Sequence, residues 1–262
     1  MRLFNLLSSL TLISSPLTFA AAISANDTRQ PVVLELFTSE GCSSCPPADA
    51  LLQKLDQTQP IPGAFLIVLS EHVDYWDRLG WKDSFSSPLF SRRQQGYVSR
   101  FQLESAYTPQ VVVDGNAEAL GSDAGRIQNA VRTSLTGDKY KVEITQVFNN
   151  DRGTPQVHIQ VEAPRKAVKQ DARLMLAFAE NSAVSDVRRG ENRGRTLSHV
   201  AVVRSLVDFG KIDPSGNFSA DVPLTGELAK WEGKRLIAFV QSPQYGRIQG
   251  AAVRLLSTTV SR

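Results

Sequence analysis

Residues 31–45 read PVVLELFTSEGCSSC, an apolar run followed by a short polar turn and two closely spaced cysteines. The apolar run is typical of a buried β-strand. From residue 48 to residue 55, apolar side chains recur at the spacing of an amphipathic helix. A second apolar run, residues 64–69, follows. Strand, helix and strand in this order predict two parallel strands joined by a right-handed crossover.

The two cysteines are the only ones among the 262 residues. A disulfide that closes so short a loop stabilises a fold by only about 2 kcal/mol on the chain-entropy model. The C-x-x-C spacing therefore favours redox chemistry or soft-metal binding over a structural role. We predict that Cys42 is the more exposed cysteine and the attacking thiolate, and that Cys45 resolves the mixed disulfide. An inert surface disulfide is the alternative interpretation.

The N-terminus predicts export. Residues 1–22 combine Arg2, an apolar stretch and a run of three alanines, which is typical of a secretory signal peptide. No apolar run reaches the ~18–20 residues of a membrane-spanning helix. We therefore expect a soluble periplasmic or secreted protein with no stable membrane insertion.

The rest of the first half continues an α/β pattern. Residues 88–101 predict a helix, and residues 110–113 a strand entered through a proline. Asp114-Gly115 is a hairpin turn signal, after which residues 117–120 can pair back and residues 127–135 form a helix. We predict an α/β domain over residues 23–137, with a helical insertion from about residue 71 to residue 107.

The hydrophobic period changes to two beyond residue 137, which is typical of half-buried strands. Turn signals at residues 149–153 and 213–216 separate some of these strands. The predicted strands are residues 140–148, 157–161, 174–178, 200–207, 218–222, 236–240 and 248–255. They predict a second domain, an all-β sandwich of immunoglobulin-like architecture, over residues 138–262.

Three motifs resemble those of one exported bacterial family, catalogued as domain of unknown function 1223. They are GCSSCPPAD at residues 41–49, HVDYW at residues 72–76 and RGENRGRTLSH at residues 189–199. The loop FTSEGCSSC at residues 37–45 also resembles the active-site loop of thioredoxins. The resemblance implies a thioredoxin-like fold for the α/β domain. It also implies a cis Thr108–Pro109 bond facing the cysteines, with Pro109 in the catalytic set and Thr108 binding substrate.

Two features near the cysteines bear on their reactivity. Proline disfavours helical geometry in its predecessor, so Pro46 and Pro47 are expected to move Cys45 and Pro46 out of the αR region. The helix would then begin at Pro46 or Pro47, and its dipole would activate Cys42 less. Glu35 lies in the apolar strand, and we predict a solvated or paired carboxylate there rather than a proton relay.

His72, Asp74 and Trp76 follow the second strand, at the sheet end that carries the cysteines. Ligands bind at this end of open α/β sheets. We predict substrate recognition or proton transfer for these side chains, with packing of the insertion as the alternative for Trp76.

Charge is distributed unevenly along the chain: residues 23–137 carry −4 and residues 138–262 carry +6. Basic side chains gather in one loop, namely Arg188, Arg189, Arg193, Arg195 and His199. We predict that this loop docks on the first domain through Glu40, Asp74 and Asp77, with an acidic external partner as the alternative. An exported protein without an aromatic-plus-basic motif is a poor candidate for nucleic-acid binding.

These observations predict a thiol–disulfide oxidoreductase that acts on protein or small-molecule thiols and disulfides. It would use a redox partner protein and no cofactor or resident metal. One alternative is a Cu(I)-binding metallochaperone with His72 as third ligand, because thiolates are soft ligands. Another is a redox-idle, partner-binding module.

Overall fold

The structure is a computed structural model that describes residues 28–148, 155–164, 171–212, 216–225, 230 and 232–257. The predicted signal peptide, residues 1–22, lies outside these ranges, as do residues 149–153 and 213–215 of the predicted turns. Within the described ranges, no helix combines the length and the apolar composition needed to cross a membrane.

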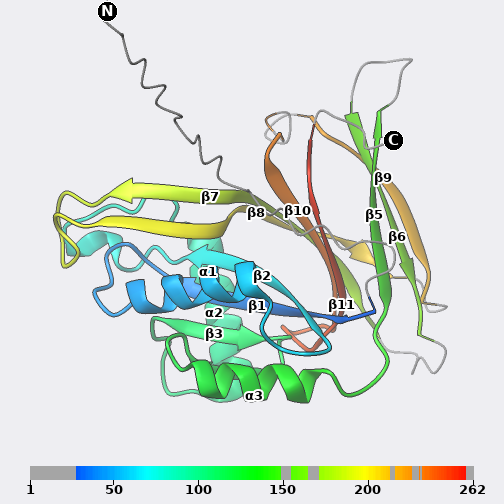
Figure 1. Ribbon diagram of the computed structural model, residues 1–262, viewed down its shortest axis with the longest axis horizontal. Helices are drawn as coiled ribbons and strands as arrows, with labels where there is room; N and C mark the ends of the chain where they lie inside the picture. Colours follow the sequence, from blue (N-terminus) through cyan, green and yellow to red (C-terminus); the bar gives the residue numbers. More distant parts are fainter. Residues whose placement is uncertain are drawn as a thin grey trace, which may run out of the picture.

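A mixed eight-stranded sheet runs through the molecule in the order β11-β10-β7-β8-β2-β1-β3-β4 (Figure 1). The strands are β1 (Gln30–Thr38), β2 (Ala64–His72), β3 (Gln110–Val113), β4 (Ala117–Leu120), β7 (Arg173–Asp186), β8 (Thr196–Lys211), β10 (Lys234–Gln241) and β11 (Ile248–Leu255). β1 and β2 pair in parallel, as their crossover predicts, and β3 pairs antiparallel to β1.

The predicted fold class, a thioredoxin-like α/β domain followed by an all-β sandwich, is wrong. The protein is mostly β, and its large mixed sheet crosses the predicted boundary at residue 137. β8 pairs in parallel with β2 at Ser70 and Val202, and β7, β10 and β11 extend the sheet beyond it. Alternation with a period of two shows that a strand buries one face, but it does not show which other strand pairs with it in the sheet. Four of the seven strands predicted for the sandwich therefore belong to the first sheet.

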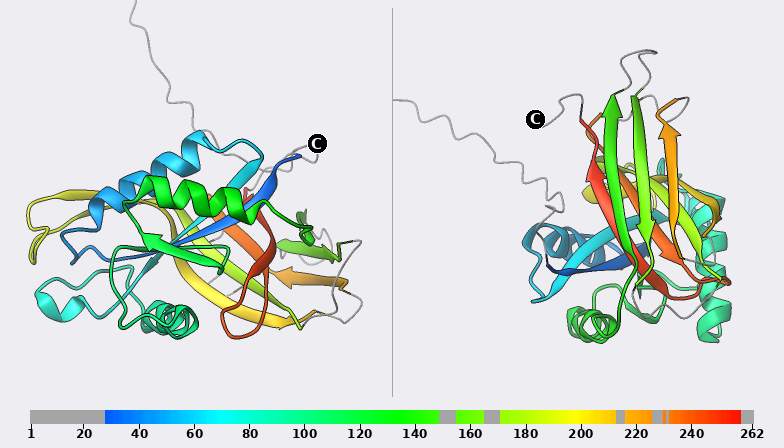
Figure 2. Two further views of the ribbon diagram at one scale, coloured as in Figure 1. Left: turned by 90° about the horizontal axis from the view of Figure 1, so that it is seen from below. Right: turned by 90° about the vertical axis from the view of Figure 1, so that its right-hand side faces the viewer.

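The other three strands form a small antiparallel sheet in the order β5-β6-β9 (Figure 2). These strands are β5 (Lys141–Phe148), β6 (Pro155–Glu162) and β9 (Phe218–Pro223). Their inward side chains, such as Val157 and Ile159, pack with Leu236 and Val240 of β10 in one hydrophobic core. A second and larger core lies around β1, β2 and the helices.

Helices cover both faces of the half of the large sheet that is formed by β2, β1, β3 and β4. α1 (Pro46–Thr58) and α3 (Ala124–Ser134) lie on one face, and α2 (Pro88–Phe101) lies on the opposite face (Figure 2). A short 3₁₀ helix, η1 (Asp77–Leu79), lies in the predicted insertion.

α1 begins at Pro46, as predicted, but Cys45 stays in the αR region with φ −76° and ψ −39°. The expectation that the prolines move Cys45 out of this region is therefore wrong. The Cys45 carbonyl oxygen accepts hydrogen bonds from the N–H groups of Ala48 (2.8 Å) and Asp49 (3.1 Å). These two bonds hold Cys45 in helical geometry despite the proline that follows it.

Glu35 is fully buried and paired rather than solvated. Its carboxylate accepts hydrogen bonds from Arg93 Nε and the Tyr97 hydroxyl of α2, each at 2.5 Å. Arg93 also lies 3.6 Å from Glu71 of β2 and donates to Gln241 of β10. We call Glu35, Glu71, Arg93, Tyr97 and Gln241 the Arg93 cluster. It joins α2 to strands from both halves of the chain.

Candidate functional site

A disulfide links Cys42 and Cys45 where the chain passes from β1 to α1. Both cysteines are 0% exposed, whereas Ser43 and Ser44 between them are exposed. The expectation that Cys42 is the more exposed cysteine is therefore wrong, and the bond is not a surface disulfide. The C-x-x-C loop presents its serines to solvent and its sulfur atoms to the protein interior.

The turn between β7 and β8, residues 187–195, holds this loop; we call it the covering turn. Asn192 Nδ2 donates hydrogen bonds to the carbonyl oxygens of Glu40 and Cys42, each at 2.9 Å. The Glu191 carboxylate accepts from the Ser43 N–H at 3.1 Å, and the hydrogen bonds from Ser43 lower the pKa of Glu191. Segments some 150 residues apart in the sequence are thus fixed together at the disulfide.

The arginines of the covering turn do not make the predicted docking contacts. Arg188, Arg189, Arg193 and Arg195 are exposed. Among the described contacts, none of these four arginines forms an ion pair with Glu40, Asp74 or Asp77, so this part of the prediction is wrong. His199, from the same predicted loop, does lie 3.8 Å from Glu40. Arg195 instead donates to Asn192 Oδ1 at 2.9 Å. The covering turn is held to the disulfide loop by the Asn192 amide and the Glu191 carboxylate, whereas the four guanidinium groups are exposed to solvent.

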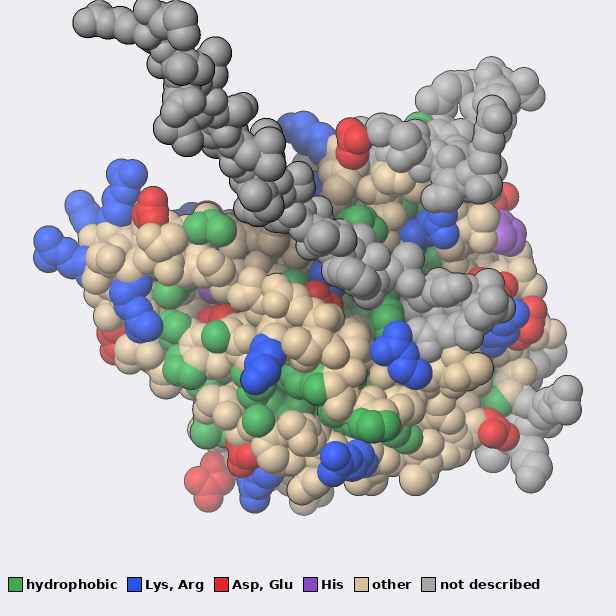
Figure 3. All heavy atoms as spheres, viewed as in Figure 1, with side chains coloured by type: hydrophobic (Ala, Val, Ile, Leu, Met, Phe, Trp, Pro, Cys, Tyr) green, Lys and Arg blue, Asp and Glu red, His purple; other side chains and the backbone are tan. Residues whose placement is uncertain are grey.

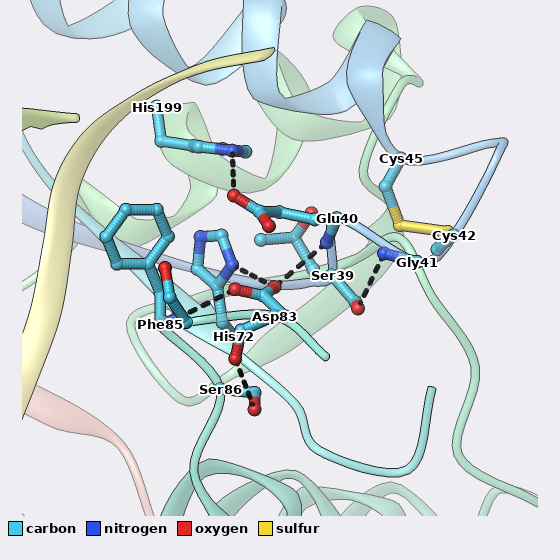
Figure 4. Close-up of polar contacts among 12 residues, drawn as sticks. Ser39, Glu40, Gly41, Cys42, Cys45, His72, Asp83, Phe85, Ser86 and His199 are labelled. Carbon is cyan, nitrogen blue, oxygen red and sulfur yellow. Dashed lines mark hydrogen bonds and ion pairs between the residues drawn. A yellow bond between two sulfur atoms is a disulfide. The ribbon is translucent and has the colours of Figure 1, made fainter. Parts of the chain in front are cut away.

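Five buried ionisable side chains lie beside the disulfide loop: Glu40, Asp49, His72, Asp83 and His199. Figure 4 shows Glu40, His72, Asp83 and His199 of this group next to the two cysteines. We call them the acid–histidine cluster. His72 Nδ1 lies 2.7 Å from Asp83 Oδ2. His199 Nδ1 lies 3.5 Å from Asp49 Oδ1, and His199 Nε2 lies 3.8 Å from Glu40 Oε1. The two imidazole rings meet edge to face, with centroids 4.7 Å apart.

The charges of this cluster depend on one another. Burial by itself lowers the pKa of His199, but the carboxylates of Asp49, Glu40 and Asp83 outweigh burial and raise that pKa above its ordinary value. Burial acts to raise the pKa of Asp83, but His72 and two backbone N–H groups outweigh it and lower that pKa. Neither ring nitrogen of His199 has a hydrogen-bond partner among the described residues. The cluster can therefore take up or release a proton without breaking a short hydrogen bond at His199.

The Thr108–Pro109 bond is cis, as the resemblance implies. The Thr108 carbonyl oxygen accepts from Ser44 Oγ at 3.4 Å, and the Thr108 hydroxyl accepts from Trp76 Nε1 at 2.9 Å. Trp76 also lies against Gly41, where an added Cβ would come within 3.1 Å of the Trp76 Cβ. Trp76 and Thr108 thus adjoin the disulfide loop, and their part in substrate binding stays a prediction.

Asp74 and His72 are placed differently from Trp76. The Asp74 carboxylate accepts a hydrogen bond from Ser91 Oγ on α2, so it is used in packing that helix. His72 is fully buried and belongs to the acid–histidine cluster. His72 therefore has no exposed surface in this structure, and its part in substrate recognition or proton transfer stays a prediction.

The most informative residues that sequence reasoning misplaced or missed come from distant segments. His199 was predicted in the basic loop but lies in β8, where Leu197 and His199 are buried and Thr196 and Ser198, which alternate with them, are exposed. Asp49 lies three residues before Leu52, so helical spacing already puts it on the buried face of α1. No period in the sequence marks Glu40, Asp83 or Asn192.

The family is decided by a direct match. A protein-family model described as "Protein of unknown function (DUF1223)" matches residues 33–241. The chain belongs to this family. Membership was predicted from the motifs at residues 41–49, 72–76 and 189–199, and all three lie within the matched range. No curated protein matches this DUF1223 chain.

Solved structures with the same arrangement include a crystal structure of a protein from Agrobacterium tumefaciens. It is 27% identical to this DUF1223 chain, with a TM-score of 0.71, over 90% of this chain and 99% of the other. HBP35 of Porphyromonas gingivalis is 14% identical, with a TM-score of 0.64, over 90% of this chain and 79% of the other. The second likeness concerns the fold alone.

The described residues of this DUF1223 chain contain no group of three or more His, Cys, Asp or Glu side chains arranged to hold a metal ion. In the Cu(I) alternative, His72 is the third ligand beside the two cysteines. Its Nδ1 is bound to Asp83, and both sulfur atoms are used in the disulfide.

Proposed function

We propose that this protein is an exported thiol–disulfide oxidoreductase, which exchanges its Cys42–Cys45 disulfide with protein or small-molecule thiols. One observation carries the proposal: hydrogen bonds that do not depend on the disulfide hold the loop that contains it. Asn192 and Glu191 bind the loop backbone, and Cys45 is fixed by the first bonds of α1. A redox pair must keep its loop in place when the bond is broken, and these contacts do not involve the sulfur atoms.

The exchange needs no further reagent. A partner thiolate attacks Cys42 Sγ, the Cys42–Cys45 bond breaks, and its electron pair leaves on Cys45 Sγ. A second partner thiol, deprotonated as it reacts, attacks the partner sulfur of the mixed disulfide and releases Cys42. The partner becomes a disulfide and the protein a dithiol, and the two protons lost by the partner end on the two cysteines. The same steps in reverse oxidise the protein.

The acid–histidine cluster supports this chemistry by its position. Asp49 lies on the first turn of α1, four residues after Cys45, and its carboxylate lies 3.5 Å from His199 Nδ1. The carboxylates raise the pKa of His199, which keeps a proton available beside the loop near neutral pH. We assign to this pair the delivery of the proton that the leaving Cys45 thiolate takes up.

Access to the sulfur atoms requires movement. Both cysteines are buried, and the covering turn is bound to the loop through Asn192 and Glu191. A reacting thiol therefore reaches Cys42 only when this turn shifts. Small hydrogen-bonded turns open far more readily than a core strand, so this step is compatible with turnover. The proposed location is the periplasm or the extracellular space, on the strength of the predicted signal peptide.

Catalysed reduction of insulin by dithiothreitol tests the proposal. We expect the mature protein to accelerate the reaction, and Cys42→Ser and Cys45→Ser to abolish the acceleration. Cys45→Ser should retain a stable mixed disulfide through Cys42. His158→Gln, an exposed histidine on the small sheet, is the matched control and should behave as wild type. A wild-type protein that gives no acceleration, or serine variants as active as wild type, would overturn the proposal.

A further inference from the structure

The covering turn carries a dense group of positive charges. Arg188, Arg189, Arg193 and Arg195 are all exposed within eight successive positions. Figure 3 shows Lys and Arg side chains gathered at the end of the molecule where the β7–β8 hairpin turns. Among the described residues, none of these four guanidinium groups has a carboxylate partner within ion-pair distance. Their charges are therefore available to a ligand.

Hydrogen bonds order the backbone beneath these arginines when the turn is closed over the disulfide. The Val187 N–H donates to the Arg195 carbonyl oxygen at 3.0 Å, and the Gly194 N–H donates to the Val187 carbonyl oxygen at 2.8 Å. Val187 is buried, and Asn192 binds both Arg195 and the cysteine loop. A surface that is already ordered loses little conformational entropy on binding, which favours affinity.

The turn also has a suitable shape. Arg188, Arg193 and Arg195 line an open hollow of about 360 Å³, together with Asp186, Val187, Gly194 and Thr196. The one carboxylate in that lining, on Asp186, accepts a hydrogen bond from the Thr196 hydroxyl. Planar guanidinium groups pair with carboxylates through two parallel hydrogen bonds. The hollow therefore fits the side chains of aspartate or glutamate.

The backbone of an exposed apolar residue lies next to the covering turn. Leu79 is 53% exposed, and its carbonyl oxygen lies 3.9 Å from the position that a Cβ would take at Gly190. Arginine beside exposed apolar surface is the usual composition of protein–protein contact sites. The carboxylates of Asp186 and Glu191 interrupt the positive charge, which disfavours the continuous negative charge of a lipid surface or a nucleic-acid backbone.

We propose that the covering turn is a docking surface for an acidic segment of a partner protein, which it holds beside the Cys42–Cys45 disulfide. The identity of this partner as a redox partner rests on the proposed function, but the binding itself requires no thiol exchange. Because the same turn covers the disulfide, an occupant of the hollow lies directly at the element that must shift for exchange. Docking and access to Cys42 therefore use one structural element.

Fluorescence anisotropy with two labelled peptides tests the proposal on the mature protein. The peptides are identical except that one has four glutamates where the other has four glutamines, and neither contains cysteine. We expect the glutamate peptide to bind about ten-fold more tightly at low salt, and raising the salt concentration to remove this preference. Arg188→Gln combined with Arg193→Gln should abolish the preference. The double variant should still fold, because neither side chain forms a hydrogen bond or an ion pair within the described residues.

The matched control removes two exposed charges elsewhere, with Lys141→Gln and Lys211→Gln, and should keep the preference. Equal binding of the two peptides by wild type, or equal losses in the arginine and lysine variants, would overturn the proposal. So would binding confined to phosphatidylglycerol vesicles or single-stranded DNA. A double variant with Cys42→Ser and Cys45→Ser separates the two proposals. If wild type fails in the insulin assay while this variant keeps the preference, docking stands and the proposed function falls.

Discussion

The Arg93 cluster and the acid–histidine cluster are both buried, both contain several carboxylates, and both join strands from the two halves of the chain. They differ in the cation. In the Arg93 cluster a guanidinium lies 2.5 Å from Glu35 and 3.6 Å from Glu71 and stays charged at any pH in which the protein folds. In the acid–histidine cluster the positive charge is carried by an imidazole, because the carboxylates of Asp49, Glu40 and Asp83 outweigh burial and raise the pKa of His199 above its ordinary value.

Under the proposed function, the Arg93 cluster has a structural role and the acid–histidine cluster takes part in the chemistry of the disulfide. The Arg93 cluster has a permanent positive charge, and burial together with the negative charge of Glu35 raises the pKa of Glu71 well above its ordinary value. Its cation therefore stays charged across the neutral range. The acid–histidine cluster can lose its positive charge there through His199, and it is the one that adjoins the disulfide. Three substitutions within the clusters test whether they differ in this way, and a fourth, in the covering turn, tests access to the disulfide.

The largest effect is expected from Arg93→Met. It leaves Glu35 and Glu71 buried without a cation, which should lower the free energy of unfolding by about 3–5 kcal/mol at neutral pH. Urea denaturation at neutral pH measures the effect. The neighbouring Arg92 is exposed, so Arg92→Met should stay within about 0.5 kcal/mol of wild type. Equal losses in the two variants would remove the structural role of the Arg93 cluster.

Asn192→Ala removes two hydrogen bonds that attach the covering turn to the disulfide loop. Each such bond contributes about 1 kcal/mol, so we expect reduction of the disulfide by excess dithiothreitol to become about thirty-fold faster. Stopped-flow alkylation of the released thiols measures the rate. Ser198→Ala, an exposed position in the same hairpin, should leave the rate unchanged. An unchanged or slower rate in Asn192→Ala would mean that the turn does not limit access.

His199→Gln addresses the titration of the acid–histidine cluster. The pKa of His199 is raised in the folded protein, so the folded state keeps a proton that the unfolded state releases above about pH 6.5. The stability from this group is complete below that pH and is lost as the pH rises through the folded-state pKa. The loss amounts to about 1.4 kcal/mol for each unit by which the pKa is raised. Urea unfolding across this window should show a flatter pH slope in His199→Gln, whereas the exposed His158→Gln keeps the wild-type slope.

The smallest effect at neutral pH is expected from Glu71→Gln. Burial and the negative charge of Glu35 raise the pKa of Glu71 well above its ordinary value, which favours the neutral carboxyl group, and an amide should replace that group at a cost within about 1 kcal/mol. The stability that depends on the proton of Glu71 is lost as the pH rises through its folded-state pKa. The variant should therefore lose less stability than wild type in alkaline solution. Parallel pH profiles would show that Glu71 is ionised in the fold.

The sequence predicts local structure well because local structure depends on neighbouring residues. The helix over residues 88–101, the strand at 110–113 and the start of α1 at Pro46 follow from spacing and proline chemistry. The pairing of β8 with β2 depends on residues about 130 positions apart, so the predicted division into two domains was wrong. The same holds for the candidate site. The spacing of Cys42 and Cys45 reveals them in the sequence, whereas Asn192 and His199 are brought next to them only by the pairing of β8 with β2.

The redox equilibrium between Cys42–Cys45 and glutathione tests most directly whether this disulfide is chemically active. The fraction of reduced protein is measured by alkylation over a series of glutathione ratios, while circular dichroism monitors folding. Structural disulfides in secreted proteins have potentials below about −300 mV. We expect a reversible two-electron transition above that value, with the protein folded in both states. A potential below that value, or reduction that occurs only when the protein unfolds, would contradict a role in thiol–disulfide exchange.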